Sequence, residues 1–167
     1  VFYACLLNNQ PMGFYHPATL VQDAQRHQVR VEPIDVFESD WLCTVIGEKS
    51  LRLGLMYVSS LHRESGEAIP WERGKKPFDS VEDLRRRAKL NRAEMRTLAE
   101  IGALGSFGMK RRQALWQVEK LFRPAGPLFE QLNEPEGTFP LPTMNVQERL
   151  IADYRGTGLT LKDHPLT

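Results

Sequence analysis

Segment 90–118 constrains the fold more than any other part of the chain, because two helical patterns follow each other across a glycine-containing turn. Asn91 is a residue type that caps helices, and apolar residues recur at helical spacing after it. Gly102 can end this first helix in a left-handed conformation. A second helical pattern starts near Lys110 and carries an apolar stripe that includes Leu115 and Val118. The segment therefore predicts two short helices joined by a hairpin.

Basic residues gather at the start of the second helix, where the helix dipole favours acidic groups. They are Lys110, Arg111 and Arg112. Three glycines in the turn let the backbone approach a ligand, and these are Gly102, Gly105 and Gly108. Free N–H groups at a helix start donate to phosphate oxygens. The pattern predicts a phosphate-binding helix-hairpin-helix element, and an ordinary helical hairpin with a solvated basic face is the alternative.

The charge distribution supports the first interpretation. The whole chain has a net charge of only +1, but residues 73–123 contain 14 Lys and Arg against 6 Asp and Glu. A basic block between two acidic flanks is typical of a nucleic-acid-binding surface. Further basic residues lie just before the hairpin and would add to its field, namely Arg85, Arg86, Arg87, Lys89, Arg92 and Arg96.

The remaining patterns predict a mainly α chain with a small β patch, in the α+β class. Helices are expected over about 2–9, 16–27, 80–87 and 145–154, and short strands near 29–34, 41–46 and 51–55. A helical pair is expected over 56–61 and 65–73, with a kink or delayed start at Pro70. This pair resembles a weak first copy of the hairpin motif. Because Ser60-Leu61-His62 stands where a Gly-x-Gly pattern is expected, we predict a mainly structural role for it.

The composition shifts to proline and glycine from Pro124, which predicts a Pro-rich linker with a short helix over 124–167. Cys5 and Cys43 lie in apolar runs and predict buried free thiols. No His, Cys or carboxylate spacing predicts a metal site, and Asp35 and Asp40 are expected to cap turns. We expect Trp41, Trp71 and Trp116 in the core. No apolar run is long enough to cross a membrane.

Several segments together resemble the alpha subunit of bacterial DNA polymerase III, a C-family polymerase, and most closely its error-prone branch. They occur in the family's order and cover nearly the whole chain. The segments are LLNNQPMGFYHPATLVQDAQRH, VEPIDV followed by SDW, RLGL, VEDLRRRA, RRQALW and ADYRGTGLTLKDHP.

This resemblance implies that the chain is a fragment, with residues 1–47 similar to the late fingers and 48–123 to the tandem helix-hairpin-helix module. An OB-fold would follow, and the catalytic palm would lie upstream. The family's activity is DNA-directed DNA synthesis in replication and damage-tolerant repair, carried by palm aspartates that hold Mg²⁺. The piece is therefore expected to be inactive alone and to hold no cofactor of its own. A cytoplasmic location is implied, with the rest of the polymerase chain and other replication or mutasome proteins as partners.

Two functions stay open from the sequence. The first is sequence-independent binding of duplex template-primer DNA, through Gly102, Gly105, Gly108, Lys110, Arg111, Arg112, Arg85, Arg86 and Arg92. The second is a structural connector between the polymerase core and its downstream modules, without DNA contact. An exposed hairpin would favour the first function, and a buried hairpin the second.

Overall fold

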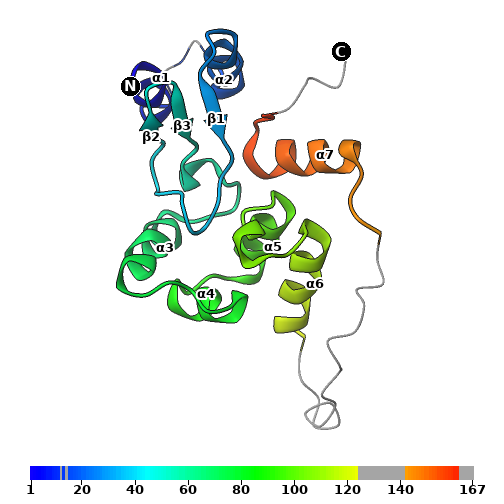
Figure 1. The fold of residues 1–167 in the computed structure, drawn as a ribbon. Helices are drawn as coiled ribbons and strands as arrows, with labels where there is room; N and C mark the ends of the chain where they lie inside the picture. Colours follow the sequence, from blue (N-terminus) through cyan, green and yellow to red (C-terminus); the bar gives the residue numbers. More distant parts are fainter. Residues whose placement is uncertain (12, 14, 124–141, 162–167) are drawn as a thin grey trace, which may run out of the picture.

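The computed structural model describes residues 1–11, 13, 15–123 and 142–161, and Figure 1 shows a mainly helical chain with one small sheet, as expected. The expected Pro-rich linker falls largely on 124–141, outside the described residues. The helices are α1 (Phe2–Asn8), α2 (Pro17–Arg26), α3 (Arg63–Lys75), α4 (Val81–Arg87), α5 (Arg92–Glu100), α6 (Arg111–Leu121) and α7 (Val146–Thr157). Two 3₁₀ turns join them, η1 (Leu55–Tyr57) and η2 (Gly105–Phe107).

The sheet has three short strands, β1 (Arg30–Glu32), β2 (Thr44–Gly47) and β3 (Ser50–Arg52). β3 lies in the centre, parallel to β1 and antiparallel to β2, so the strands pair across the expected boundary at 47/48. Val31 and Leu51 are opposite each other in the register and are both buried. In Figure 1 the sheet lies beside α1 and α2, away from α6.

The α5–α6 pair forms as the sequence predicts. Asn91 and Glu94 make a reciprocal capping box that fixes the start of α5, and Gly102 ends the helix region at φ +83°. The apolar faces of the two helices are buried against each other, with Met95 and Leu98 on α5 and Val118 on α6 fully enclosed. Burying side chains of this size stabilises the fold by roughly 1.5–3 kcal/mol each.

Helix α7 packs across this pair at the α5 side (Figure 1). Gly156 is buried against Ile101, because a Cβ on Gly156 would lie 2.1 Å from the Ile101 Cγ2 atom. The Gly156 carbonyl accepts a 2.6 Å hydrogen bond from the N–H of Ser59, in the first hairpin. Leu159, just after the helix, is 2% exposed. The C-terminal half of α7 is thus tied to both hairpins.

The helix expected over 56–61 is wrong, because this segment contains only part of the short η1 turn. Of the kink or delayed start expected at Pro70, the delayed start is wrong, because α3 begins at Arg63 and runs through Pro70. Proline removes the hydrogen bond to the carbonyl four residues earlier, here that of Gly66. Gly66 lies against the Trp41 ring and Ile69 is fully buried, so packing of the turn before Pro70 keeps the helix continuous.

Three burial expectations are also wrong. Cys5 is exposed because it points away from the α1 face that carries Leu7, whereas Cys43 is buried as expected. Trp71 and Trp116 are 69% and 39% exposed. Each of these rings lies beneath a cation instead, Lys75 at 5.4 Å and Arg123 at 5.2 Å from the ring centroid.

Candidate nucleic-acid interface

The second hairpin, residues 101–110, is exposed along its tip. Gly105 and Gly108 are exposed, and a Cβ added at either position would meet no atom within 4 Å. Gly108 has φ +78°, a conformation that only glycine adopts without strain, so its residue type is required by the backbone. One side of the hairpin is supported by the segment after β1, where Ser106 donates a 2.7 Å hydrogen bond to Asp35.

The start of α6 presents unpaired backbone donors. The N-cap residue Lys110 makes no side-chain cap, and the first hydrogen bond of the helix runs from the Ala114 N–H to the Lys110 carbonyl at 2.9 Å. The N–H groups of 109–113 consequently have no acceptor among the described residues. Lys110 is exposed, and its ammonium makes no ion pair within the part of the chain that the structure describes. Unpaired N–H groups beside a free cation form a local anion-binding geometry.

Arg111 lies under α7 rather than over the hairpin tip. Its guanidinium pairs with Asp153 at 2.6 Å and donates to the carbonyls of Glu100 and Arg149 at 3.3 Å each. The side chain crosses Gly102, where a Cβ would lie 2.7 Å from the Arg111 Nε atom. Gly102 therefore serves both to end the helix region and to admit Arg111.

Arg112 also faces α7. Its guanidinium donates to the Glu148 carboxylate at 2.7 Å, and the two side chains are 24% and 41% exposed. Glu148 at the same time accepts the Asn145 N–H in the capping box of α7. A single carboxylate thus joins the start of α7 to the start of α6.

The other predicted cations lie towards the last turn of α6 or on α4, away from the start of α6, and they differ in how they are held. Arg85 lies 5.1 Å from the ring of Phe122, and its Nε is buried without a partner among the described residues. Arg86 pairs with Asp83 at 3.0 Å but keeps 75% of its side chain exposed. Arg92 is 60% exposed and pairs with Glu119 on α6.

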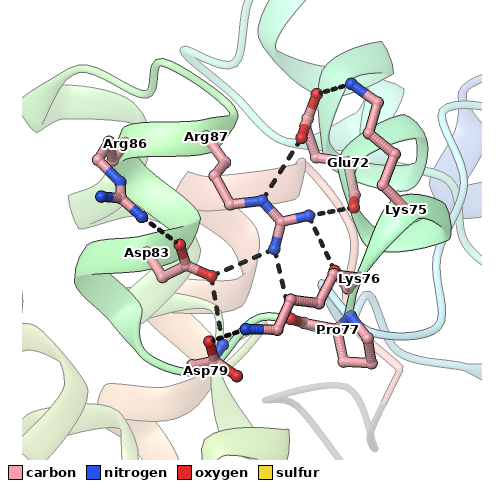
Figure 2. A network of polar contacts seen from close by, with 8 residues as sticks. All are labelled: Glu72, Lys75, Lys76, Pro77, Asp79, Asp83, Arg86 and Arg87. Atoms are coloured by element: carbon pink, nitrogen blue, oxygen red, sulfur yellow. Dashed lines mark hydrogen bonds and ion pairs between the residues drawn. The ribbon is translucent and has the colours of Figure 1, made fainter.

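Arg87, which the sequence places in the same basic field, is structural. Figure 2 shows its guanidinium between α3 and α4, where it contacts the Glu72 and Asp83 carboxylates and the backbone carbonyls of Glu72, Lys76 and Pro77. Its side chain is only 15% exposed. The stacking contact with Phe78, 4.8 Å from the ring centroid, encloses it further.

The first hairpin uses its backbone donors internally. The Ser59 N–H donates to Gly156, the Leu61 N–H to Val58, and the His62 N–H to the buried Glu94 carboxylate at 3.0 Å. Ser60 adopts φ +66° in place of a glycine, and its hydroxyl lies 2.8 Å from that of Thr97. The first hairpin, which lacks the expected glycines, therefore directs these N–H groups towards the protein interior.

Carboxylates are present near the site, but they are held by the chain itself. Asp35 accepts the N–H of Phe37 at 2.8 Å, as expected of a turn cap, and Asp40 pairs with Arg73 at 2.7 Å. In the ranges that the structure describes, no three His, Cys, Asp or Glu side chains are placed to bind one metal ion. None of the described helices combines the length and apolar character needed to cross a lipid bilayer.

Residues 28–114 match the model of the helix-hairpin-helix motif family, and this match covers both hairpins and the start of α6. The chain therefore belongs to the helix-hairpin-helix family.

The chain is also similar, over 99% of its length, to a segment of error-prone DNA polymerases, which confirms the resemblance drawn from its motifs. It is 45% identical over 171 residues to the error-prone DNA polymerase of Alkalilimnicola ehrlichii and 43% identical over 175 residues to that of Ralstonia nicotianae. The chain spans 16% of the length of each of these two relatives.

Proposed function

We propose that this chain binds duplex DNA without sequence preference, through the exposed second hairpin and the start of α6. The observation that carries the proposal is the set of N–H groups at 109–113 that have no acceptor among the described residues, beside the exposed Lys110. Such groups bind phosphate oxygens and read no base. Gly105 and Gly108 leave open space in which a sugar-phosphate backbone can approach.

The predicted cations that lie away from the start of α6 are proposed to attract DNA at longer range. Arg86 and Arg92 are the more exposed members of the predicted set, and each is already paired with a carboxylate of the chain. Arg85 is held against Phe122. The sequence predicts phosphate contacts for Arg111 and Arg112. To make them, the two side chains would have to give up their ion pairs with Asp153 and Glu148 of α7.

We propose further that the chain acts within an error-prone DNA polymerase, where it would hold template-primer duplex in the cytoplasm during replication or damage-tolerant repair. The relatives' name supports this context. Mg²⁺ and nucleotidyl transfer would belong to other parts of such an enzyme. The described residues offer no group of three metal-ligating side chains, so no step of that chemistry is assigned to them.

A salt titration of duplex binding tests the proposal. The protein would be titrated onto a fluorescein-labelled duplex between about 50 and 200 mM salt, with Lys110→Ala and the matched control Lys49→Ala, an exposed lysine in the β2–β3 turn. We expect K110A to weaken binding and to reduce the slope of log affinity against log salt by about one, whereas K49A leaves both unchanged. Binding without salt dependence, or equal behaviour of the two variants, would contradict the proposal.

A connector role is a second candidate for the first hairpin alone. Its N–H groups are used within the chain, and the bond from Ser59 to Gly156 ties it to α7. We propose that this hairpin holds α7 and the second hairpin in one arrangement and makes no phosphate contact. Replacing the exposed His62 by alanine should then leave the salt slope of duplex binding unchanged, and a slope reduced by about one would contradict this role.

A further inference from the structure

We propose that α7 is an autoinhibitory clasp, in which the Glu148 carboxylate occupies the Arg112 guanidinium until a DNA phosphate displaces it. The inference rests on the proposed function and adds a regulatory contact to the same site.

The first observation is the position of the acidic groups. Helix α7 has two acidic residues, Glu148 and Asp153, and they pair with two consecutive residues in the first turn of α6. The N–H groups of that same turn have no acceptor among the described residues. A carboxylate, like a DNA phosphate, is negatively charged and accepts hydrogen bonds from arginine. The two carboxylates of α7 therefore pair with the arginines as DNA phosphates would.

The second observation is a difference between the two pairs. Arg111 is held by Asp153 and by two backbone carbonyls, and it crosses Gly102, so its guanidinium has three acceptors around one nitrogen. Among the described residues Arg112 has one partner, Glu148, which is 41% exposed. An ion pair that is partly open to solvent contributes little to stability, and a phosphate can exchange with it. Arg112 is therefore the residue over which α7 and DNA compete.

The third observation is that the two halves of α7 are attached differently. Around Gly156 and Leu159 the helix end is buried and hydrogen-bonded to the first hairpin. Towards the other end, Val146 is 69% exposed and Ile151 is 51% exposed. Loss of the Glu148 contact would loosen the first turn of α7, while the bond from Arg111 to the Arg149 carbonyl and the buried C-terminal end hold the rest of the helix in place. A phosphate near Arg112 would favour this release, because it brings a negative charge close to Glu148.

The experiment is a double-mutant cycle of duplex binding with Glu148→Gln, Arg112→Gln and the double variant. Glutamine also serves in a capping box, so E148Q keeps the start of α7. Glu82→Gln, which removes an exposed carboxylate in the first turn of α4, controls for the change in net charge. If α7 is a clasp, E148Q tightens duplex binding roughly fivefold and raises the salt slope by about one, because one more cation is available. E82Q does neither, and E148Q has no effect when Arg112 is already glutamine.

Two results would overturn the clasp while leaving duplex binding intact: E148Q binds like the unmodified protein, or E148Q has the same effect with and without Arg112. The second result would assign the change to the long-range field alone. If neither the unmodified protein nor E148Q binds duplex at 50 mM salt, the proposed function itself fails, and the clasp fails with it. Thermal unfolding of each variant verifies that the fold is kept.

Discussion

The buried carboxylate of Glu94 accepts hydrogen bonds from both the backbone N–H of His62, at 3.0 Å, and its imidazole, at 2.9 Å, and so joins the first hairpin to α5. Its other oxygen accepts the Asn91 N–H at 2.8 Å and completes the capping box of α5. The side chain is 1% exposed. One carboxylate therefore fixes the start of α3, the start of α5 and the inward direction of the first hairpin.

This arrangement predicts an acid-dependent loss of stability. Burial raises the pKa of Glu94, but hydrogen bonds from Asn91, His62 and Ser65 outweigh it and hold the pKa below the ordinary value of 4.5. A group with a lowered pKa in the folded state stabilises the fold above its unfolded pKa, and that stabilisation is lost as the pH falls towards the folded pKa.

Glu94→Gln should accordingly lower the free energy of unfolding at pH 7 by about 1.5–3 kcal/mol, and the difference from the unmodified protein should shrink below pH 4.5. Urea denaturation at pH 7, 5, 4 and 3 measures this. The exposed Glu38→Gln is the control and should be neutral at every pH. A difference between E94Q and the unmodified protein that stays constant with pH would show that Glu94 acts by packing alone.

Arg86 and Arg87 are adjacent in the sequence, but we expect their replacement to change the stability of the protein by very different amounts. Arg87→Gln removes the cation that joins α3 and α4 in Figure 2 and leaves the Glu72 and Asp83 carboxylates without it. We expect a loss of about 2–3 kcal/mol in the free energy of unfolding. Arg86→Gln, at a side chain that is 75% exposed, should change it by no more than about 0.5 kcal/mol. Equal effects in urea denaturation would contradict the structural role of Arg87.

Two helical glycines form another matched pair. A Cβ on Gly156 would lie 2.1 Å from Ile101, whereas Gly74 in α3 has open space around it. Gly156→Ala should destabilise the protein by about 1–3 kcal/mol through overpacking at the α5–α7 contact. Gly74→Ala should be neutral or stabilise it by up to about 1 kcal/mol, because alanine favours helix. Thermal unfolding of the two variants compares them, and a stable G156A would mean that α7 is not seated on Ile101.

Much of the second hairpin could be predicted from the sequence because its determinants are local. Asn91, Gly102 and Gly108 act on the backbone within a few residues, and the structure places them at a cap and at two positive φ angles. The predicted strands and the final helix have similar local signals. The delayed start expected at Pro70 is absent because the cost of the proline is offset by packing of Gly66 and Ile69 with partners elsewhere in the chain, which the local sequence does not show.

The partners of the arginines could not be predicted, because they come from distant positions. Arg111 and Asp153 are 42 residues apart, and Arg112 and Glu148 are 36 residues apart. Counting charges along the sequence cannot tell one cation of the basic block from another. Only the fold distinguishes Arg87, enclosed between two helices, from Lys110, exposed beside N–H groups that have no acceptor in the described part of the chain.

The most direct measurement follows the backbone amide resonances of both hairpins during titration with duplex DNA. We expect the amides of 108–113 to shift in proportion to bound duplex, and to return as salt is raised. The inward-facing amides of Ser59, Leu61 and His62 should stay in place. Shifts at 59–62 with none at 108–113, or no shift in either hairpin at low salt, would contradict the account that the start of α6 is the phosphate-binding surface.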